Sequence, residues 1–185
     1  RAVSDVARGY STLEYDTDAM ARGSRHDHVE RLVCTLTGAE AALAVNNNAA
    51  AVMMVLHEFA RGHEAVVSRG ELVEIGGSFR VPDIMELSQA RMVEVGTTNK
   101  THAVDYERAI GADTSMLLKV HPSNYRVVGF AESVSARDLR PLADAENARR
   151  TASGEPGAGE LLVYEDQGSG AFLNLDAFGA YAEPT

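Results

Sequence analysis

The chain has 185 residues, 45% of them hydrophobic, which is enough for a single α/β domain with a substantial core. Its formal charge of −10 argues against this segment as the main nucleic-acid-binding surface, because Lys and Arg supply most of the affinity for phosphates. No apolar run is long enough to cross a membrane, and the single cysteine, Cys34, excludes an internal disulfide, so we expect a cytoplasmic protein.

Apolar and turn residues alternate along the chain in a pattern that predicts alternating helices and strands. A first helix is expected at 28–37, where the apolar spacing places Cys34 on a packed face and Gly38 ends the helix. Further helices are expected at 48–61, 82–89, 103–110 and 135–150. Strands are expected at 41–45, 64–68, 91–95, 115–121 and 160–165. This order predicts an α/β fold, a mostly parallel sheet flanked by helices on both faces.

Three consecutive asparagines, Asn46, Asn47 and Asn48, stand where the expected strand 41–45 gives way to an Ala-rich helix. The first N–H groups of a helix have no partner inside it, and the helix dipole adds partial positive charge there. These asparagines and Ala49 are therefore candidates for binding a phosphate group. A capped turn without any ligand is the alternative interpretation, since Asn often caps helices.

Asp166 follows the apolar run 161–164 and precedes Gly168 in a Gly-rich bend. Ligands of open α/β sheets bind at the carboxyl ends of strands, so Asp166 is placed to contact one. A phosphate site and a later carboxylate suit pyridoxal phosphate, because a neighbouring carboxylate favours the protonated form of the cofactor's ring nitrogen. A metal ligand and a helix cap are the alternatives for Asp166.

His121, Ser123 and Asn124 follow another expected strand, at the edge where such a cofactor would lie. Asn124 could donate a hydrogen bond to the cofactor's phenolic oxygen, and His121 could contact the ring or the substrate. Ordinary turn chemistry around Pro122 is the alternative, because proline forces an extended bend and Ser and Asn are common turn residues.

Several long strings of unusual composition carry a family resemblance. They are Gly9-Tyr10-Ser11, Arg22-Gly23-Ser24-Arg25, Leu36-Thr37-Gly38-Ala39-Glu40 leading into the asparagines, residues 68–80, Glu94-Val95-Gly96-Thr97-Thr98-Asn99-Lys100-Thr101, and residues 119–126. On these strings the chain resembles bacterial selenocysteine synthase, the L-seryl-tRNA(Sec) selenium transferase, among the aminotransferase-like pyridoxal phosphate enzymes. Pro122 and Gln167 depart from the family, which would have threonine and leucine there.

The resemblance implies that residues 1–185 form part of the large, cofactor-binding domain of a fold type I transferase dependent on pyridoxal phosphate. The N-terminal tRNA-binding region, the lysine that binds the cofactor and the C-terminal domain would lie outside the chain. The implied reaction converts seryl-tRNA(Sec) to selenocysteinyl-tRNA(Sec) with selenophosphate, by way of an aminoacrylate. The implied assembly is a ring of dimers, with tRNA contacts mostly outside this chain.

The same resemblance implies that the chain alone is inactive, because neither Lys100 nor Lys119 matches the cofactor-binding lysine. Lys119 stands in an apolar run, where a buried amine can have a lowered pKa, and is a weak candidate as a substitute. Two rival functions stay open: a related lyase acting on a small amino acid or amino sugar, and a noncatalytic assembly or binding module.

Arg22 and Arg25 flank a Gly-Ser pair, and a fork-shaped guanidinium suits an oxyanion such as selenophosphate. The resemblance favours Arg25 for this role and leaves Arg22 open; solvated arginines paired with nearby aspartates are the alternative. His26 and His28 have no third ligand nearby, so we assign no metal.

The segment 68–80 carries Glu71, Glu74 and Arg80 around a Gly-Gly pair. Glu71 or its neighbours would face the substrate if this segment covers the cofactor ring. A surface cluster of ion pairs is the alternative, and the sequence does not separate the two.

Overall fold

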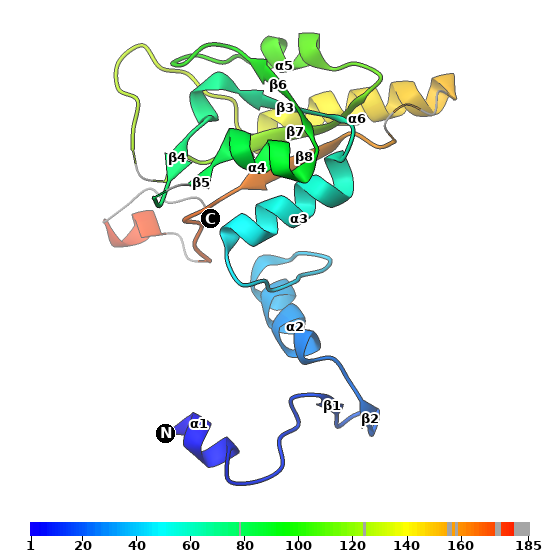
Figure 1. Cartoon of the computed structure of the whole chain (residues 1–185), viewed down its shortest axis with the longest axis vertical. Helices are drawn as coiled ribbons and strands as arrows, with labels where there is room; N and C mark the ends of the chain where they lie inside the picture. The colour runs from blue at the N-terminus through cyan, green and yellow to red at the C-terminus, as the bar shows by residue number, and fades with distance from the viewer. Residues whose placement is uncertain (78, 124, 155–156, 158, 173–174, 180–185) are drawn as a thin grey trace. The chain divides into compact units, whose positions relative to one another are not determined.

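The computed structural model describes residues 1–77, 79–123, 125–154, 157, 159–172 and 175–179. The chain divides into two compact units, residues 1–46 and 47–185 (Figure 1). None of the first 46 residues is buried, so the first unit has no hydrophobic core of its own. Within the described part of the chain, no helix has both the length and the apolar character needed to cross a bilayer.

The first unit consists of short helices and a small hairpin. Its elements are α1 (Ala2–Val6), the antiparallel strands β1 (Tyr15–Asp16) and β2 (Ala21–Arg22), and α2 (Arg25–Thr37). The sequence predicts α2, which begins three residues earlier than expected because Ser24 and Asp27 form a capping box. Gly38 ends this helix with a φ of +76°, as expected. Cys34 is half-buried, and Leu32 and Leu36 are exposed, so the described residues do not form the packed face predicted around Cys34.

The strand predicted at 41–45 is wrong. These residues form no strand, and the chain continues through bends at Asn46 and Asn47 into the next helix. A strand needs a hydrogen-bonding neighbour, and no described strand pairs with this segment. Leu43 is 59% exposed, so its apolar character does not report burial here.

A four-stranded parallel sheet forms the centre of the second unit. Its strands are β3 (Glu64–Ser68), β6 (Arg91–Val95), β7 (Thr114–Val120) and β8 (Leu162–Asp166), in the spatial order β6-β3-β7-β8. Two of the predicted strands match β3 and β6 residue for residue, and β7 and β8 lie within two residues of their predicted bounds. The predicted parallel α/β sheet is therefore confirmed.

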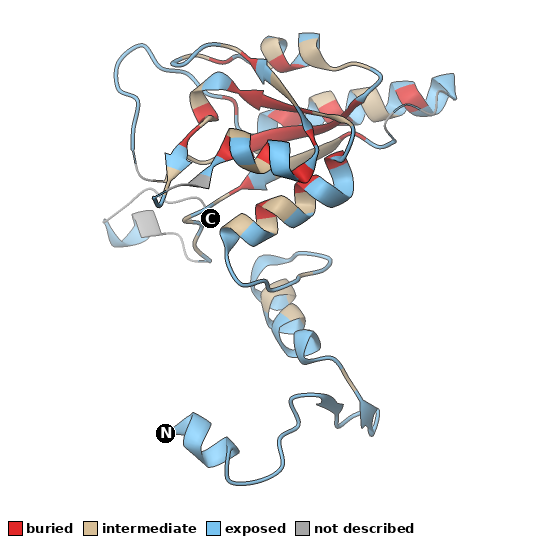
Figure 2. Cartoon of the chain, viewed as in Figure 1, coloured by how far each residue is buried: buried red, intermediate tan, exposed pale blue. Residues whose placement is uncertain are grey.

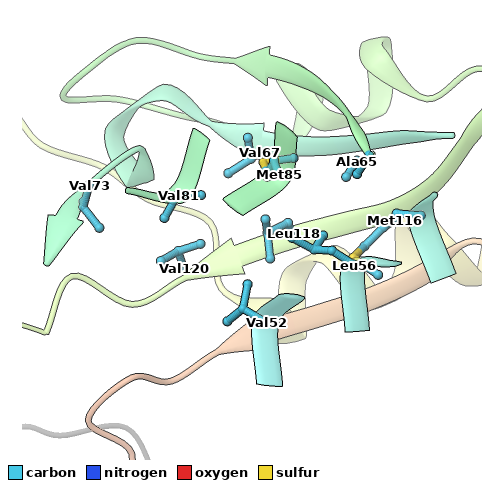
Figure 3. Close-up of a cluster of buried hydrophobic side chains, with 12 residues drawn as sticks. Val52, Leu56, Ala65, Val67, Val73, Val81, Met85, Met116, Leu118 and Val120 are labelled. Atoms are coloured by element: carbon cyan, nitrogen blue, oxygen red, sulfur yellow. The ribbon is translucent and has the colours of Figure 1, made fainter. Parts of the chain in front are cut away.

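Helices cover both faces of this sheet. They are α3 (Asn48–Ala60) and α4 (Val81–Ser88) on one face, and α5 (Ala103–Ala109) and α6 (Ala136–Ser153) on the other. Every residue of β7 is buried, which explains its continuous apolar run (Figure 2). Leu118 belongs to the cluster that includes Leu56 and Met85 (Figure 3), whereas Leu117 belongs to the opposite cluster with Tyr106 and Leu139.

Four short elements described in the second unit have no counterpart in the sequence predictions, as is also true of α1, β1 and β2 in the first unit. These four are the 3₁₀ turns η1 (Arg69–Glu71) and η2 (Leu175–Phe178), and the hairpin of β4 (Glu74–Ile75) with β5 (Phe79–Arg80). Elements of two to four residues are too short to show a periodic pattern of apolar residues. They nevertheless matter, because η1 directly follows β3 at the carboxyl end of the sheet.

Arg150, near the end of α6, holds together the opposite end of the sheet. Its guanidinium donates hydrogen bonds to the carbonyls of Gly111, Thr114 and Gly159, at 3.0, 2.7 and 2.7 Å. Hydrogen bonds from Arg149 and from Arg150 lower the pKa of Glu146 to about 2. The start of β7 and the loop that leads into β8 are thereby tied to one helix.

Truncation of Leu118 tests the central position of β7. Leu118→Ala removes a side chain that is fully buried, and we expect it to lower the free energy of unfolding by roughly 2–5 kcal/mol. Leu87→Ala is the matched control, because Leu87 is 66% exposed on α4. Chemical denaturation of the two variants measures both values. Equal losses would contradict the assigned core.

Candidate functional site

The candidate site forms where the start of α3 meets the carboxyl ends of β7 and β8. The Asn48 side-chain amide donates to Asp166 Oδ1 at 2.7 Å, and the backbone N–H of His121 donates to the Asp166 carbonyl at 2.9 Å. A Cβ added to Gly168 would lie 3.9 Å from Asn48 Oδ1 and 4.0 Å from Ser123 Oγ. Asn48, His121, Ser123, Asp166 and Gly168, five predicted site residues that span more than 100 positions of the sequence, are thus neighbours. Asn124 lies outside the described residues.

The first turn of α3 combines a cap with free donors. Asn47 has extended backbone angles, and its Oδ1 accepts the N–H of Ala50 at 2.9 Å. The capping interpretation is therefore confirmed for Asn47. Helix geometry still leaves the N–H groups of Asn48 and Ala49 without partners inside the helix, and the helix dipole favours an anion beside them. Phosphate binding at this turn stays a prediction.

Asp166 is the buried acid of the site. It is 4% exposed, and burial raises the pKa of its carboxyl above the usual range, against smaller lowering effects of the Asn48 hydrogen bond and of His121. Its side chain accepts from Asn48 rather than from a helix N–H, which argues against the helix-cap interpretation. Among the described residues, no group of three or more His, Cys, Asp or Glu side chains could hold a metal.

His121 and Ser123 leave the sheet directly after β7. The Nδ1 atom of His121 is buried and has no hydrogen-bond partner within the described structure. A buried polar atom without a partner costs about 1–3 kcal/mol, so its persistence is typical of a site that binds a ligand. The peptide bond before Pro122, between them, is trans.

A cavity of 810 Å³ opens beside these residues, over the carboxyl ends of β3, β6 and β7. His121 and Ser123 line it together with Glu71, Lys119 and Tyr125. Its volume lies in the range of pockets that bind small molecules and cofactors. Asp166 and Asn48 are not among the described residues that line the cavity. His121 and Ser123 line it and also lie beside Asp166 and Gly168, so the cavity adjoins the Asp166 site at the end of the sheet where ligands bind.

The structure separates the acids of segment 68–80, which the sequence leaves undecided. Glu74 pairs with Arg80 at 2.7 Å on the surface, as the ion-pair interpretation predicts. Glu71 is 4% exposed and forms an ion pair with Lys119, whose side chain is also buried. This pair is not predicted from the sequence. The signal for it is Lys119 inside a run of buried residues, since a buried ammonium needs an acid beside it.

Arg22, Arg25 and Asn46 belong to the first unit, and Asp166 belongs to the second. Arg22 lies in β2 opposite Tyr15. Arg25 is the first residue of α2, and its guanidinium forms an exposed ion pair with Glu14. A site for the selenium donor at Arg25 stays a prediction.

The sequence matches the family SelA, L-seryl-tRNA selenium transferase, over residues 1–185. It is 51% identical over its whole length to the L-seryl-tRNA(Sec) selenium transferase of Maridesulfovibrio salexigens. It is 53% identical over 184 residues to the enzyme of the same name from Nitratidesulfovibrio vulgaris. The chain belongs to the L-seryl-tRNA selenium transferase family, and it spans 37% and 36% of the length of these two relatives.

Solved structures with a similar fold include a D-glucosaminate-6-phosphate ammonia-lyase, with a TM-score of 0.59 and 24% identity. The likeness covers 78% of this chain and 40% of the lyase. A putative sugar aminotransferase from Streptococcus pneumoniae, in its PLP form, has a TM-score of 0.52 and 15% identity, over 77% of this chain and 35% of that protein. The predicted fold class, an α/β fold with a mostly parallel sheet flanked by helices, is confirmed, and these enzymes share it.

Replacement of Asp166 by asparagine tests the electrostatic state of the site. A raised pKa means that the folded chain binds the Asp166 proton more tightly than the unfolded chain does. This residue's contribution to stability therefore falls as the pH rises from about 4 through the folded pKa. We expect Asp166→Asn to stabilise the ligand-free chain relative to wild type more at about pH 7 than at about pH 4.

Urea unfolding at the two pH values gives this comparison. Glu165→Gln is the matched control, because Glu165 is the preceding residue of β8 and is exposed. The same pH dependence in both variants would contradict the assignment of a buried, destabilised carboxylate to Asp166.

Proposed function

We propose that the chain is the cofactor-binding part of a pyridoxal phosphate-dependent enzyme that converts seryl-tRNA(Sec) to selenocysteinyl-tRNA(Sec) with selenophosphate. The observation that carries this proposal is the Asn48–Asp166 hydrogen bond, which places a buried acid beside the start of a helix. Membership of the family supports the choice of substrates. Residues 1–185 would form part of the large domain of that enzyme.

The residues present fit the proposed cofactor at both of its ends. Free N–H groups at the start of α3 suit the phosphate, and Asp166 suits a protonated ring nitrogen. The buried Nδ1 of His121 has no partner in the described structure and offers a hydrogen bond to a ring substituent or substrate. The adjoining cavity of 810 Å³ gives room for the reacting part of the substrate.

When bound, pyridoxal phosphate supplies a ring that withdraws electrons from the substrate's α-carbon. Asp166 holds a proton on the ring nitrogen, and its buried position strengthens that interaction because no water screens it. Asn48 orients the carboxylate by donating to one of its oxygens. Asn47 serves the site indirectly, since its cap fixes the first turn of α3.

Arg25 would bind the phosphate of the selenium donor, with Arg22 as a second candidate. A guanidinium forms two parallel hydrogen bonds to an oxyanion, which suits selenophosphate. In the ligand-free chain Arg25 pairs with Glu14, so donor binding would exchange one anionic partner for another. Because that ion pair is exposed, breaking it costs little.

The assembly and partners are part of the same proposal. Seryl-tRNA(Sec) would bind mostly through regions outside this chain, because the charge of −10 disfavours a large phosphate-binding surface here. A cytoplasmic homo-oligomer, a ring of dimers, is the proposed assembly. A lyase acting on a small amino acid or amino sugar has less support, since relatives about 51% identical carry the transferase name.

The test uses a polypeptide that contains residues 1–185 and is about as long as the relatives. We expect Asp166→Ala to reduce formation of selenocysteinyl-tRNA(Sec) on the order of 10²-fold or more, because a pre-organised charge at the reacting group is lost. Glu165→Ala, at the neighbouring exposed position, should leave the rate unchanged. Product is measured from labelled seryl-tRNA(Sec) with selenophosphate. An Asp166→Ala variant as active as the control would refute the proposal.

Lys119 gives a second test, in the chain of 185 residues. Its amine is buried and donates a hydrogen bond to the Glu71 carboxylate, so it is not free to attack a carbonyl. We expect no adduct on Lys119 after incubation with pyridoxal phosphate and borohydride, as measured by peptide mass spectrometry. Lys100 reports nonspecific labelling. A stable adduct confined to Lys119 would show that it acts as the cofactor lysine after all.

A further inference from the structure

Glu71 is a buried acid to which the proposed reaction assigns no role. It ends η1, the 3₁₀ turn that follows β3, and this turn is anchored at both sides. Ser68 Oγ accepts the Gly70 N–H at 3.2 Å and lies 2.6 Å from Thr101 Oγ1. A Cβ on Gly70 would come within 2.8 Å of the Thr98 carbonyl, so the turn packs closely against the loop after β6. The position of Glu71 is therefore well defined.

The carboxylate of Glu71 completes the hydrogen bonding of β7. Strand β3 pairs with β7 only as far as Val67 opposite Leu118. Beyond that point Glu71 Oε2 accepts the backbone N–H of Val120 at 2.9 Å. The following backbone N–H, that of His121 just after β7, donates to the Asp166 carbonyl of β8 on the opposite side of the strand. A side chain thus replaces the strand neighbour that β3 no longer provides.

The charges around Glu71 explain why it can act as this acceptor. Burial raises the pKa of its carboxyl, and the ion pair with Lys119 together with the Val120 hydrogen bond lowers it. Glu165, next to Lys119 in the β7–β8 register, acts to raise it. The hydroxyls of Tyr106 and Tyr125 donate to the carbonyls of Leu118 and Gly70, so neither supplies another charge. Lys119 is thus the group that favours the ionised carboxylate.

We propose that Glu71 is a positioning residue of the cofactor site, whose carboxylate fixes the end of β7 and thereby holds His121 and Ser123 opposite Asp166 and Asn48. That this is a cofactor site rests on the proposed function, whereas the positioning of His121 and Ser123 by Glu71 does not depend on which ligand binds. Lys119 supports Glu71 as its counterion. A buried ion pair adds little net stability on average, so its place beside the candidate site points to positioning.

Two double variants isolate the hydrogen bond to Val120 from the buried charges. Glu71→Gln with Lys119→Met keeps a side-chain oxygen as acceptor and removes both charges. Glu71→Ala with Lys119→Met removes the acceptor as well. Glu74→Gln is the control, because Glu74 is an exposed acid of the same segment. Circular dichroism establishes which variants are folded. Glu71→Leu with Lys119→Met, which removes the acceptor but keeps more of the buried volume, replaces the Ala/Met variant if that variant does not fold.

Amide hydrogen exchange tests the positioning without any ligand. We expect exchange at Val120 and His121 to rise about tenfold in the Ala/Met variant, as befits the loss of one buried hydrogen bond. Exchange should stay near wild type in the Gln/Met variant, in the control, and at Leu117 in all variants. Glu71→Gln alone also keeps the acceptor and should protect Val120. Equal exchange at Val120 and His121 in wild type and in the folded variant without the acceptor would overturn the proposal.

Affinity for pyridoxal phosphate, measured by equilibrium dialysis on the same folded samples, tests the link to the site. We expect binding about tenfold weaker in the Ala/Met variant and near wild type in the Gln/Met variant. A purely structural role would lower thermal stability without this difference in affinity, and equal affinities would overturn the proposal. Wild-type protein that binds no pyridoxal phosphate would instead count against the proposed function, and amide exchange would still decide the positioning.

Discussion

The hydrogen bond between Asn48 and Asp166 connects the two parts of the candidate site, the helix start that could bind an anion and the buried acid. It links the first turn of α3 to the last residue of β8, across 118 positions of sequence. This contact forms because β7 and β8 run parallel and end together, next to the first turn of α3, which packs on one face of the sheet. An anion at the helix start and a cation at the carboxylate would therefore be held a fixed distance apart, as a ligand such as pyridoxal phosphate requires.

Among the described residues of this unit, the buried side chains of Asp166, Glu71, Lys119 and Arg150 each have a partner. Asp166 accepts from Asn48, Glu71 pairs with Lys119, and Arg150 bonds to three carbonyls and to Glu146. The first two interactions lie at the carboxyl end of the sheet, whereas Arg150 secures the amino-terminal end. These interactions make the sheet a rigid support, and its carboxyl end positions His121 and the cavity beside it.

Local sequence signals predict the frame well because they arise from local physics. Continuous apolar runs and a capping serine or glycine place β3, β6, α2 and α6 to within a few residues. The acid at the end of β8 is also predicted, since strand ends are ligand sites. Segment 41–45 has the same apolar character, but no strand in the described part of the chain pairs with it. The burial of Glu71 depends on β7, far along the chain. The spacing of apolar residues along the sequence gives no information about such long-range partners.

The central claim is that Asp166 is a buried carboxylate whose ionised form Asn48 stabilises. Carbon-13 NMR titration of the Asp166 carboxyl group measures this directly, in wild type and in Asn48→Ala. A wild-type pKa above the usual aspartate range, raised further by Asn48→Ala, is the predicted result, since burial raises this pKa and the Asn48 hydrogen bond lowers it. An ordinary or depressed wild-type pKa, unchanged in the variant, would contradict the claim.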